Sequence, residues 1–197
     1  MKRFIEIPRP LILASRSPRR ANLLRQIGLE FETRESTVLE PTAQNVDPIH
    51  HVIELSQRKA TNAALQTAEE LIIGADTIVV VDEKILGKPR NRDEAQQMLQ
   101  LLSGREHFVY TGFTLLAQPE GKSISDFEKT SVRFRRLESW EIEQYINLEQ
   151  PLDKAGSYGI QGLSAVFVES ICGCYYNVVG LPLTKFYLVL RKFLSEL

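Results

Sequence analysis

The chain has little cysteine, no excess of either charge and no long apolar run. Of its 197 residues only two are cysteines, Cys172 and Cys174, with one residue between them. Two such close cysteines cannot build a disulfide framework, and no second Cys or His pair completes a zinc site. We therefore expect two small half-buried thiols rather than a redox or metal centre.

The charge balance and the apolar runs exclude further classes of partner. The net charge is −1 at pH 7, and no basic tail or stripe is present, so bulk binding to nucleic acid or to a membrane surface is not expected. The longest apolar run, Leu71–Val81, contains Asp76 and is too short to span a membrane. The N-terminal residues lack the apolar stretch of a signal peptide. A reducing, cytoplasmic location is the expectation.

Length and composition predict one globular domain over residues 1–197. Apolar periodicity predicts strands over 10–15, 30–36, 71–81, 107–117, 123–134, 164–169 and 175–179. It predicts helices over 18–27, 92–102 and 139–147, a long helix that begins at Asp47-Pro48, and a C-terminal helix that begins at Pro182. This mixture predicts an α/β protein with a mixed sheet, in which 71–81 is central because it is apolar on both faces.

The segment 11–20 joins a short apolar strand to a helix start. Ser17 is a typical N-cap and Pro18 a typical first helical residue. Arg19 and Arg20 follow in the first turn, where the helix end already carries partial positive charge and unsatisfied N–H groups. Two cations there are costly unless an anion lies among them, so the segment predicts a phosphate-bearing ligand.

Asp76 is the second strong signal, because an unpaired carboxylate inside an apolar strand is costly. Gly74 just before it suggests a bulge or a close backbone approach. We favour a metal ligand or general base over an exposed strand-end carboxylate. Lys59 lies on the flank of the apolar stripe of its helix, where it either extends along the surface or reaches a site above the sheet.

The remaining polar candidates carry little information alone. Lys88 lies between Gly87 and Pro89 in a turn that is no Walker motif, and such a lysine is usually solvated. Glu40 stands alone in an irregular segment. The glycine-rich segment 153–162, which contains Gln161, is either an ordinary surface loop or a loop around a base or ribose. The three histidines show no ligand spacing.

Taken together, these segments resemble the Maf family of septum-formation-inhibitor-like nucleoside triphosphate pyrophosphatases over about residues 10–190. The pieces that carry the resemblance are Leu13-Ala-Ser-Arg-Ser-Pro-Arg-Arg20, Gly74-Ala-Asp-Thr77, Gly87-Lys-Pro-Arg90, Leu102-Ser-Gly104, Tyr110-Thr-Gly112, the segment 153–162 and Asn177-Val-Val-Gly-Leu-Pro-Leu183. The chain departs from the family at Cys174, where serine is more usual.

The resemblance implies an elongated, twisted mixed sheet of the Maf/ITPase-like kind, with a cleft between two lobes, and frequent homodimers. It implies hydrolysis of a nucleoside triphosphate to the monophosphate and pyrophosphate with a divalent cation, Mg²⁺ or Mn²⁺. Within the family the motifs resemble the branch that acts on dTTP and UTP. A 7-methyl-GTP pyrophosphatase and a non-enzymatic nucleotide-binding regulator of cell division are the alternatives.

The resemblance also implies roles for single residues. Asp76 would be the proton acceptor and, with Glu40, would hold the metal. Cationic groups and the Ser15–Ser17 turn would bind the phosphates, while two polar side chains would read the pyrimidine. The phosphate-binding set is Ser15, Arg19, Arg20, Lys59 and Lys88. The base-reading pair is Thr77 and Gln161, which with Arg19 match the family's selectivity positions.

Overall fold

A computed structural model describes residues 5–38, 46–64 and 69–197. Its centre is a seven-stranded mixed sheet in the order β2-β1-β3-β5-β6-β7, with β4 also paired to β3. The strands are β1 (Leu11–Ala14), β2 (Glu32–Thr33), β3 (Glu70–Val81), β4 (Lys84–Leu86), β5 (Glu106–Gln118), β6 (Lys122–Phe134) and β7 (Val168–Cys172). β1 pairs parallel with β2 and β3, and the other pairs are antiparallel. The predicted α/β mixed sheet is confirmed, and β3 lies inside it.

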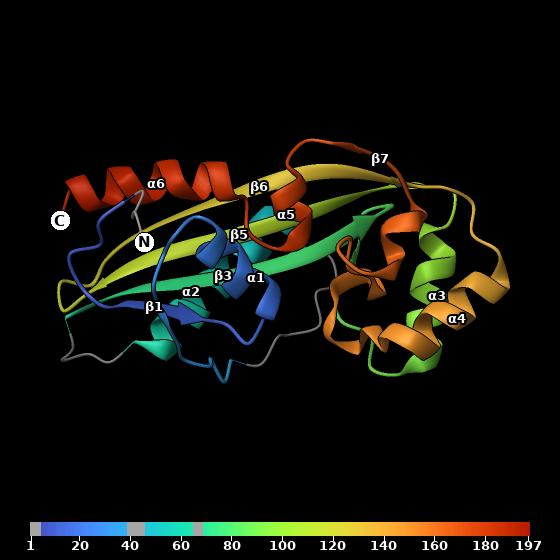
Figure 1. Ribbon diagram of the computed structural model, residues 1–197, viewed down its shortest axis with the longest axis horizontal. Coiled ribbons are helices and arrows are strands. Elements are labelled where there is room, and N and C mark those ends of the chain that lie inside the picture. Colours follow the sequence, from blue (N-terminus) through green and yellow to red (C-terminus); the bar gives the residue numbers. More distant parts are fainter. Residues whose placement is uncertain (1–4, 39–45, 65–68) are drawn as a thin grey trace.

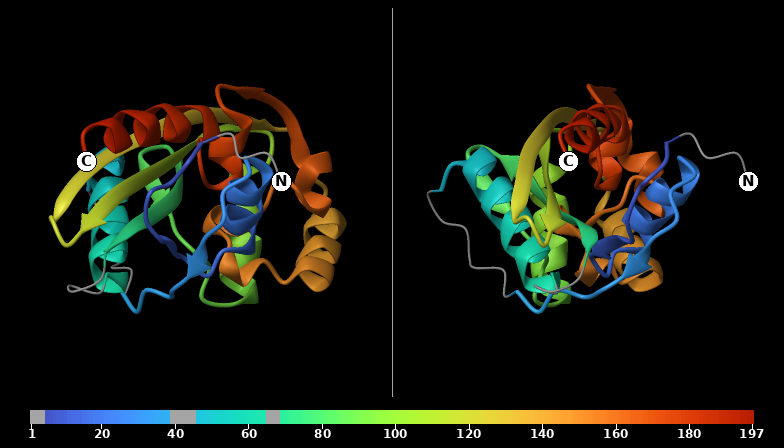
Figure 2. Two further views of the ribbon diagram at one scale, coloured as in Figure 1. Left: turned by 60° about the vertical axis from the view of Figure 1, so that its left-hand side comes forward. Right: turned by 90° about the vertical axis from the view of Figure 1, so that its left-hand side faces the viewer.

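Helices cover both faces of the sheet. They are α1 (Pro18–Gln26), α2 (Pro48–Ala63), α3 (Arg92–Leu102), α4 (Ser139–Glu149), α5 (Tyr175–Val179) and α6 (Leu183–Ser195). Figure 2 shows α2 on one face and α1 and α6 on the other. Figure 1 shows α3, α4 and the turns that follow α4 grouped at one end of the long strands, as a second lobe. The predicted cleft between the lobes stays a prediction. In the described part of the chain, no helix has the length and apolarity needed to cross a membrane.

β3 is buried on both faces, and its side chains alternate between two cores. The side chains of Leu71, Ile73 and Val79 belong to the large core shared with α1, α5 and α6. Ile72 and Ile78 pack instead with α2 side chains. This double burial explains why the sequence of β3 shows no alternation of polar and apolar residues.

Two glycines allow α2 to lie unusually close to the sheet. A Cβ atom at Gly74 would stand 2.1 Å from the carbonyl oxygen of Ser56, and one at Gly112 would stand 2.5 Å from that of Val52. Both distances are far below van der Waals contact. The close backbone approach expected at Gly74 is therefore confirmed, and its partner is α2.

Two predicted strands are wrong. Residues Leu163–Phe167 form a 3-10 helix, and the strand runs over Val168–Cys172 instead. The side chain of Ser164 donates to the carbonyl oxygen of Gly159 at 2.8 Å, which holds this segment in a turn.

The predicted strand over 175–179 is helix α5. It is held by contacts with β5 and β6 that override the strand propensity of its valines. The short strand β4 was not predicted, because it follows a turn at Asp82 and Glu83 whose positive φ angles of 47° and 62° usually call for glycine or asparagine. Both cysteines are free thiols, with Cys174 half-buried and Cys172 exposed.

Candidate functional site

β3 has an open interval along one edge. β5 pairs with one side of β3 from Glu70 to Val80. On the other side β1 pairs with residues 71–74 and β4 with residues 79–81. In the described chain, residues 75–78 therefore have no strand partner on that side, and Asp76 and Thr77 lie in the middle of this interval. The end of a parallel strand at such a point is where α/β proteins bind ligands.

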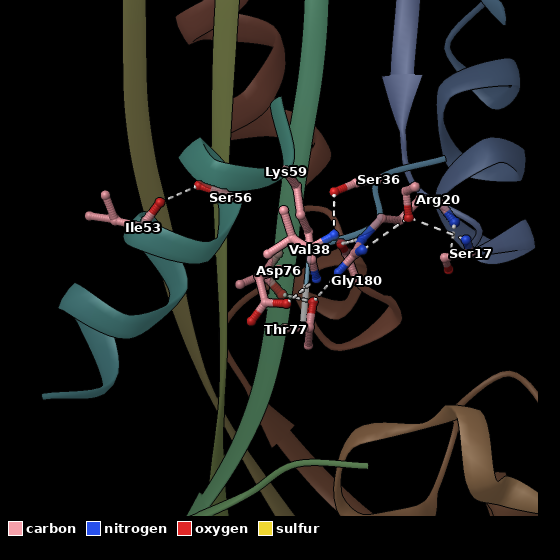
Figure 3. A network of polar contacts seen from close by, with 12 residues as sticks. Ser17, Arg20, Ser36, Val38, Ile53, Ser56, Lys59, Asp76, Thr77 and Gly180 are labelled. Atoms are coloured by element: carbon pink, nitrogen blue, oxygen red, sulfur yellow. Dashed lines mark hydrogen bonds and ion pairs between the residues drawn. The ribbon is translucent and has the colours of Figure 1, made fainter. Parts of the chain in front are cut away.

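Asp76 faces α2 and forms a buried ion pair. Only 4% of Asp76 and 9% of Lys59 is exposed, and the Nζ atom of Lys59 donates to Oδ1 of Asp76 at 2.6 Å. Figure 3 shows Lys59 reaching from α2 to the strand. Lys59 therefore does not extend along the surface but reaches from its helix to the strand. The pairing also offsets the cost of burying the carboxylate.

Arg20 lies on the opposite face of β3, next to the same interval. Its guanidinium donates from Nε to the carbonyl oxygen of Gly180 at 2.8 Å, from Nη1 to Oγ of Ser15 at 3.1 Å and from Nη2 to Oγ1 of Thr77 at 2.9 Å. Ser15 Oγ also accepts from the backbone N–H of Ser17, which closes the turn before α1. The structure thus brings together the predicted residues Ser15, Arg20 and Thr77.

The direction of each hydrogen bond at Thr77 follows from counting protons. The hydroxyl of Thr111 donates to the carbonyl oxygen of Asn177 at 3.0 Å, since a carbonyl cannot donate. Its single proton is then used, so in the 2.9 Å contact between Thr77 and Thr111 the donor is Thr77. Thr77 accepts from Arg20 and donates to Thr111. Any ligand atom that binds the Thr77 hydroxyl must therefore be a donor.

Arg19 ties the first turn of α1 to the segment 153–162. Its Nη1 atom lies 3.2 Å from Oδ2 of Asp153, with the Arg19 side chain 25% exposed. Partial burial acts to raise the pKa of Asp153. The hydrogen bond and charge of Lys154, together with the charge of Arg19, outweigh it and hold that pKa below its usual range. Arg19 thus has an acidic partner at the rim of the site.

The turn that carries Lys88 also approaches the open interval. The chain leaves β4 at Leu86, opposite Val79, and the carbonyl oxygen of Gly87 accepts from the backbone N–H of Gly156 at 3.0 Å. Lys88 itself is exposed. A Cβ at Gly156 would lie 2.9 Å from the Val79 side chain, so the segment 153–162 packs directly on β3.

Of the remaining two predicted site residues, only Gln161 belongs to the described part of the chain. Gln161 is exposed and makes no hydrogen bond within the described chain. Glu40 lies outside the described residues. Their assigned contacts with the base and the metal stay predictions.

A divalent cation at the interval would have few protein ligands within the described chain. Among the described residues, no three His, Cys, Asp or Glu side chains are grouped so that they could hold a metal ion. Mg²⁺ is usually bound by one or two carboxylates, with substrate phosphates and water as its other ligands. Asp76 is a carboxylate of this kind beside a predicted phosphate site, so it fits a cation that binds together with the nucleotide.

Sequence reasoning missed the role of Thr111, Asn177, Gly180 and Asp153. All four lie inside motifs that carry the family resemblance, but nothing in those motifs shows which residue each one contacts. The hydrogen bond between Thr111 and Asn177 spans 66 residues. Only the folded sheet makes these residues neighbours.

Fold and candidate site together define an α/β protein with cationic side chains gathered around an open interval of the internal strand β3. A buried lysine–carboxylate pair lies on one face of β3, and a buried arginine at a helix start lies on the other. A family model described as Maf-like protein matches residues 10–193. The chain belongs to the Maf family.

Several curated relatives cover nearly the whole chain. A protein of Desulforamulus reducens named dTTP/UTP pyrophosphatase is 47% identical over 189 residues, which are 96% of this chain and 99% of the relative. A protein of Thermoanaerobacter sp. strain X514 with the same name is 49% identical to this chain, over 92% of this chain and 95% of the relative. The one from Carboxydothermus hydrogenoformans is 48% identical, over 92% of this chain and 97% of the relative.

Proposed function

We propose that this protein is a nucleoside triphosphate pyrophosphatase that converts dTTP and UTP to the nucleoside monophosphate and pyrophosphate. The observation that carries the proposal is the buried Lys59–Asp76 pair in the open interval of β3, with Arg20 held on the other side of the same strand. The names and coverage of the relatives support the same reading. Modified pyrimidine triphosphates are further candidate substrates.

In this reaction water attacks the α-phosphorus of a strongly negative substrate, so catalysis depends on neutralising charge and on placing the water. Asp76 orients the water and accepts its proton, and Lys59 keeps the Asp76 carboxylate in place. Arg19, Arg20 and Lys88 bind phosphate oxygens, where arginine forks give two-point contacts and lysine acts as a point charge.

A divalent cation, Mg²⁺ or Mn²⁺, supplies further neutralisation of the phosphate charge when it is bound. Asp76 would hold this ion, with the family resemblance placing Glu40 as the second carboxylate.

Base recognition follows from the direction of the Thr77 hydrogen bonds. Its hydroxyl proton is committed to Thr111, so Thr77 offers a ligand only an acceptor. The ring N3 of thymine and of uracil carries a proton, whereas N3 of cytosine is an acceptor. If Thr77 binds the base at ring N3, its acceptor suits dTTP and UTP and disfavours CTP, with Gln161 as the second base-reading residue.

The setting of the enzyme is also part of the proposal. One large apolar core extends from Leu11 to Phe193, which supports a single unit over residues 1–197. The two free thiols suit a reducing cytoplasm. We expect the enzyme to form a homodimer and to have no nucleic-acid or membrane partner.

The proposal is tested by pyrophosphate release from a panel of triphosphates with Mg²⁺ or Mn²⁺. The panel contains dTTP, UTP, CTP and 7-methyl-GTP. Asp76→Asn should lower kcat by about 100-fold or more, the usual contribution of a positioned general base. Chelation of the cation should abolish turnover.

A matched control lies on the same strand. Glu70 is also buried, at 3% exposure, and its carboxylate is paired with Arg34 at 2.8 and 3.0 Å. It stands six residues from Asp76, about 20 Å away along a strand. Glu70→Gln should lower stability and leave kcat close to that of the wild type.

Three results would contradict the proposal. A folded Asp76→Asn variant with normal turnover removes Asp76 from catalysis. A marked preference for 7-methyl-GTP assigns the chain to a different substrate. Nucleotide binding without cation dependence or pyrophosphate release identifies a binding regulator instead of an enzyme.

A further inference from the structure

The hydrogen-bond chain that begins at Arg20 continues across three neighbouring strands. Thr77 of β3 lies directly opposite Thr111 of β5 in the strand register, and Thr130 of β6 follows on the same face. Thr111, Thr130 and Asn177 have no exposed surface at all. Buried polar groups of this kind are costly unless their hydrogen bonds are made.

Asn177 is the central member of this chain. Its side-chain Nδ2 donates to the carbonyl oxygen of Val109 at 3.0 Å and to the hydroxyl of Thr130 at 2.9 Å. Thr130 also binds the backbone of Cys174, donating to its carbonyl and accepting from its N–H. The first turn of α5 is thereby attached to β5 and β6, and the carbonyl of Asn177 is aimed at Thr111.

The same short helix also reaches Arg20 by a second route. α5 ends at Gly180, whose φ angle of 128° belongs to the left-handed region. The carbonyl oxygen of Gly180 accepts from Nε of Arg20. Two of the three acceptors named for the guanidinium therefore depend on α5: Gly180 directly, and Thr77 through Thr111 and Asn177.

We propose that Thr111 and Asn177 are positioning residues, which hold the guanidinium of Arg20 in the orientation that binds the substrate phosphates. This inference rests on the proposed function. Neither residue touches substrate. Their effect passes through the hydroxyl of Thr77. Because Thr111 accepts the proton of that hydroxyl, a lone pair of the Thr77 oxygen is left facing Arg20.

A purely structural role of Thr111 would have different consequences from a positioning role. Isosteric replacement of a buried hydroxyl affects stability, and it does so wherever the hydroxyl lies. A positioning role affects phosphate binding as well. Because hydrogen bonds to charged groups are worth more than neutral ones, loss of the oriented Thr77 hydroxyl should weaken anion binding by about tenfold or more.

The experiment compares Thr111→Val with Thr111→Ser and with a control on the opposite face of the same strand. Thr114 is 2% exposed and its hydroxyl contacts those of Ser56 and Ser125 at 2.7 and 2.9 Å. Thr114→Val therefore removes a similarly bonded hydroxyl away from Arg20. Each variant is measured by thermal unfolding, by calorimetric binding of inorganic pyrophosphate with Mg²⁺, and by KM and kcat for UTP.

We expect Thr111→Val to weaken pyrophosphate binding and to raise KM by about tenfold or more, with kcat nearly unchanged. Thr111→Ser should keep pyrophosphate binding and KM close to the wild-type values, and Thr114→Val should lower stability only. If Thr111→Val does not fold, Thr111→Cys takes its place and is compared with Thr111→Ser, since a thiol replaces the hydroxyl of serine by a weak hydrogen-bonding group.

Normal KM and pyrophosphate affinity in the folded valine variant would overturn the proposal, as would equal losses in Thr114→Val or a serine variant that behaves like valine. Failure of the proposed function is a separate result. A wild-type protein that binds pyrophosphate in a Thr111-dependent way but hydrolyses neither dTTP nor UTP would keep the positioning role and refute the assigned reaction.

Discussion

Replacement of Gly74 by alanine should separate Lys59 from Asp76 and so lower both the catalytic rate and the stability. The new Cβ would lie 2.1 Å from the carbonyl oxygen of Ser56 and 2.8 Å from the backbone nitrogen of Ala60, whereas real Cβ atoms essentially never come closer than 3.0 Å. Because these contacts are backbone atoms, the helix as a whole must move, by about 1 Å. Lys59 lies between the two residues that are pushed.

The size of the effect follows from the short ion pair. The Lys59 Nζ to Asp76 Oδ1 distance is 2.6 Å, and a shift of about 1 Å takes it beyond the normal hydrogen-bond range. Overpacking of this kind costs about 1–3 kcal/mol of folding free energy. A misplacement of about 1 Å in catalytic geometry costs about 100-fold in rate, so we expect kcat/KM to fall by that factor while the protein still folds.

Two other glycines make the test graded. Gly112→Ala pushes α2 at Val52, where the clash is milder at 2.5 Å and lies farther from Lys59, so its loss of kcat/KM should be smaller. Gly87→Ala is the control for stability, since a Cβ there meets nothing within 4 Å. Pyrophosphate release and thermal unfolding are measured on all three. Wild-type kcat/KM in Gly74→Ala, or a larger loss in Gly112→Ala, would refute the reasoning.

Two further predictions concern pH and substrate affinity. His107 has no exposed surface, and burial lowers its pKa from 6.5 to about 4. Between these values only the unfolded chain binds the proton, so stability is complete above pH 6.5 and falls by about 3 kcal/mol as the pH drops to about 4. Urea unfolding at several pH values measures how the free energy of unfolding depends on pH. His107→Phe should weaken this dependence, whereas the control His50→Phe, at an exposed position, should keep it. An unchanged dependence in His107→Phe would exclude His107 as its source. Arg19→Ala should raise KM for UTP by about tenfold with little change in kcat, as expected for a lost charged hydrogen bond. An equal KM in that variant would place Arg19 outside the binding site.

Helix starts could be predicted because their signals are local. Ser17, Asp47 and Asn91 each accept a hydrogen bond from the backbone three residues ahead, as N-cap residues do. Helix α5 could not be predicted, because its valines favour a strand and its anchor is Thr130, 44 residues away from Cys174. Contacts of that range override local propensity and leave no mark in the segment itself.

The site was partly visible in the sequence for a similar reason. Asp76 was identifiable because a carboxylate inside an apolar strand needs an explanation, and Gly74 indicated a close approach beside it. The partner of Asp76 was not identifiable, because the reach of Lys59 depends on how near α2 lies to the sheet. Thr111 and Asn177 gave no signal, since threonine and asparagine are unremarkable until the strands are paired.

Strand geometry explains why the site lies at an edge of β3 rather than over one face. Neighbouring residues on a strand point to opposite faces, so Asp76 and Thr77 reach α2 and α1 respectively and cannot both line a pocket above the sheet. A ligand meets both only where the edge of the strand is open, between the end of β1 at Ala14 and the pairing of β4 with Val79. Ser15 is the first residue after β1 and Lys88 the second after β4. β1 and β4, which delimit the interval, are thus each followed by a residue that contributes to the site. Lengthening either strand would close the interval and draw its own residue, Ser15 or Lys88, into the sheet.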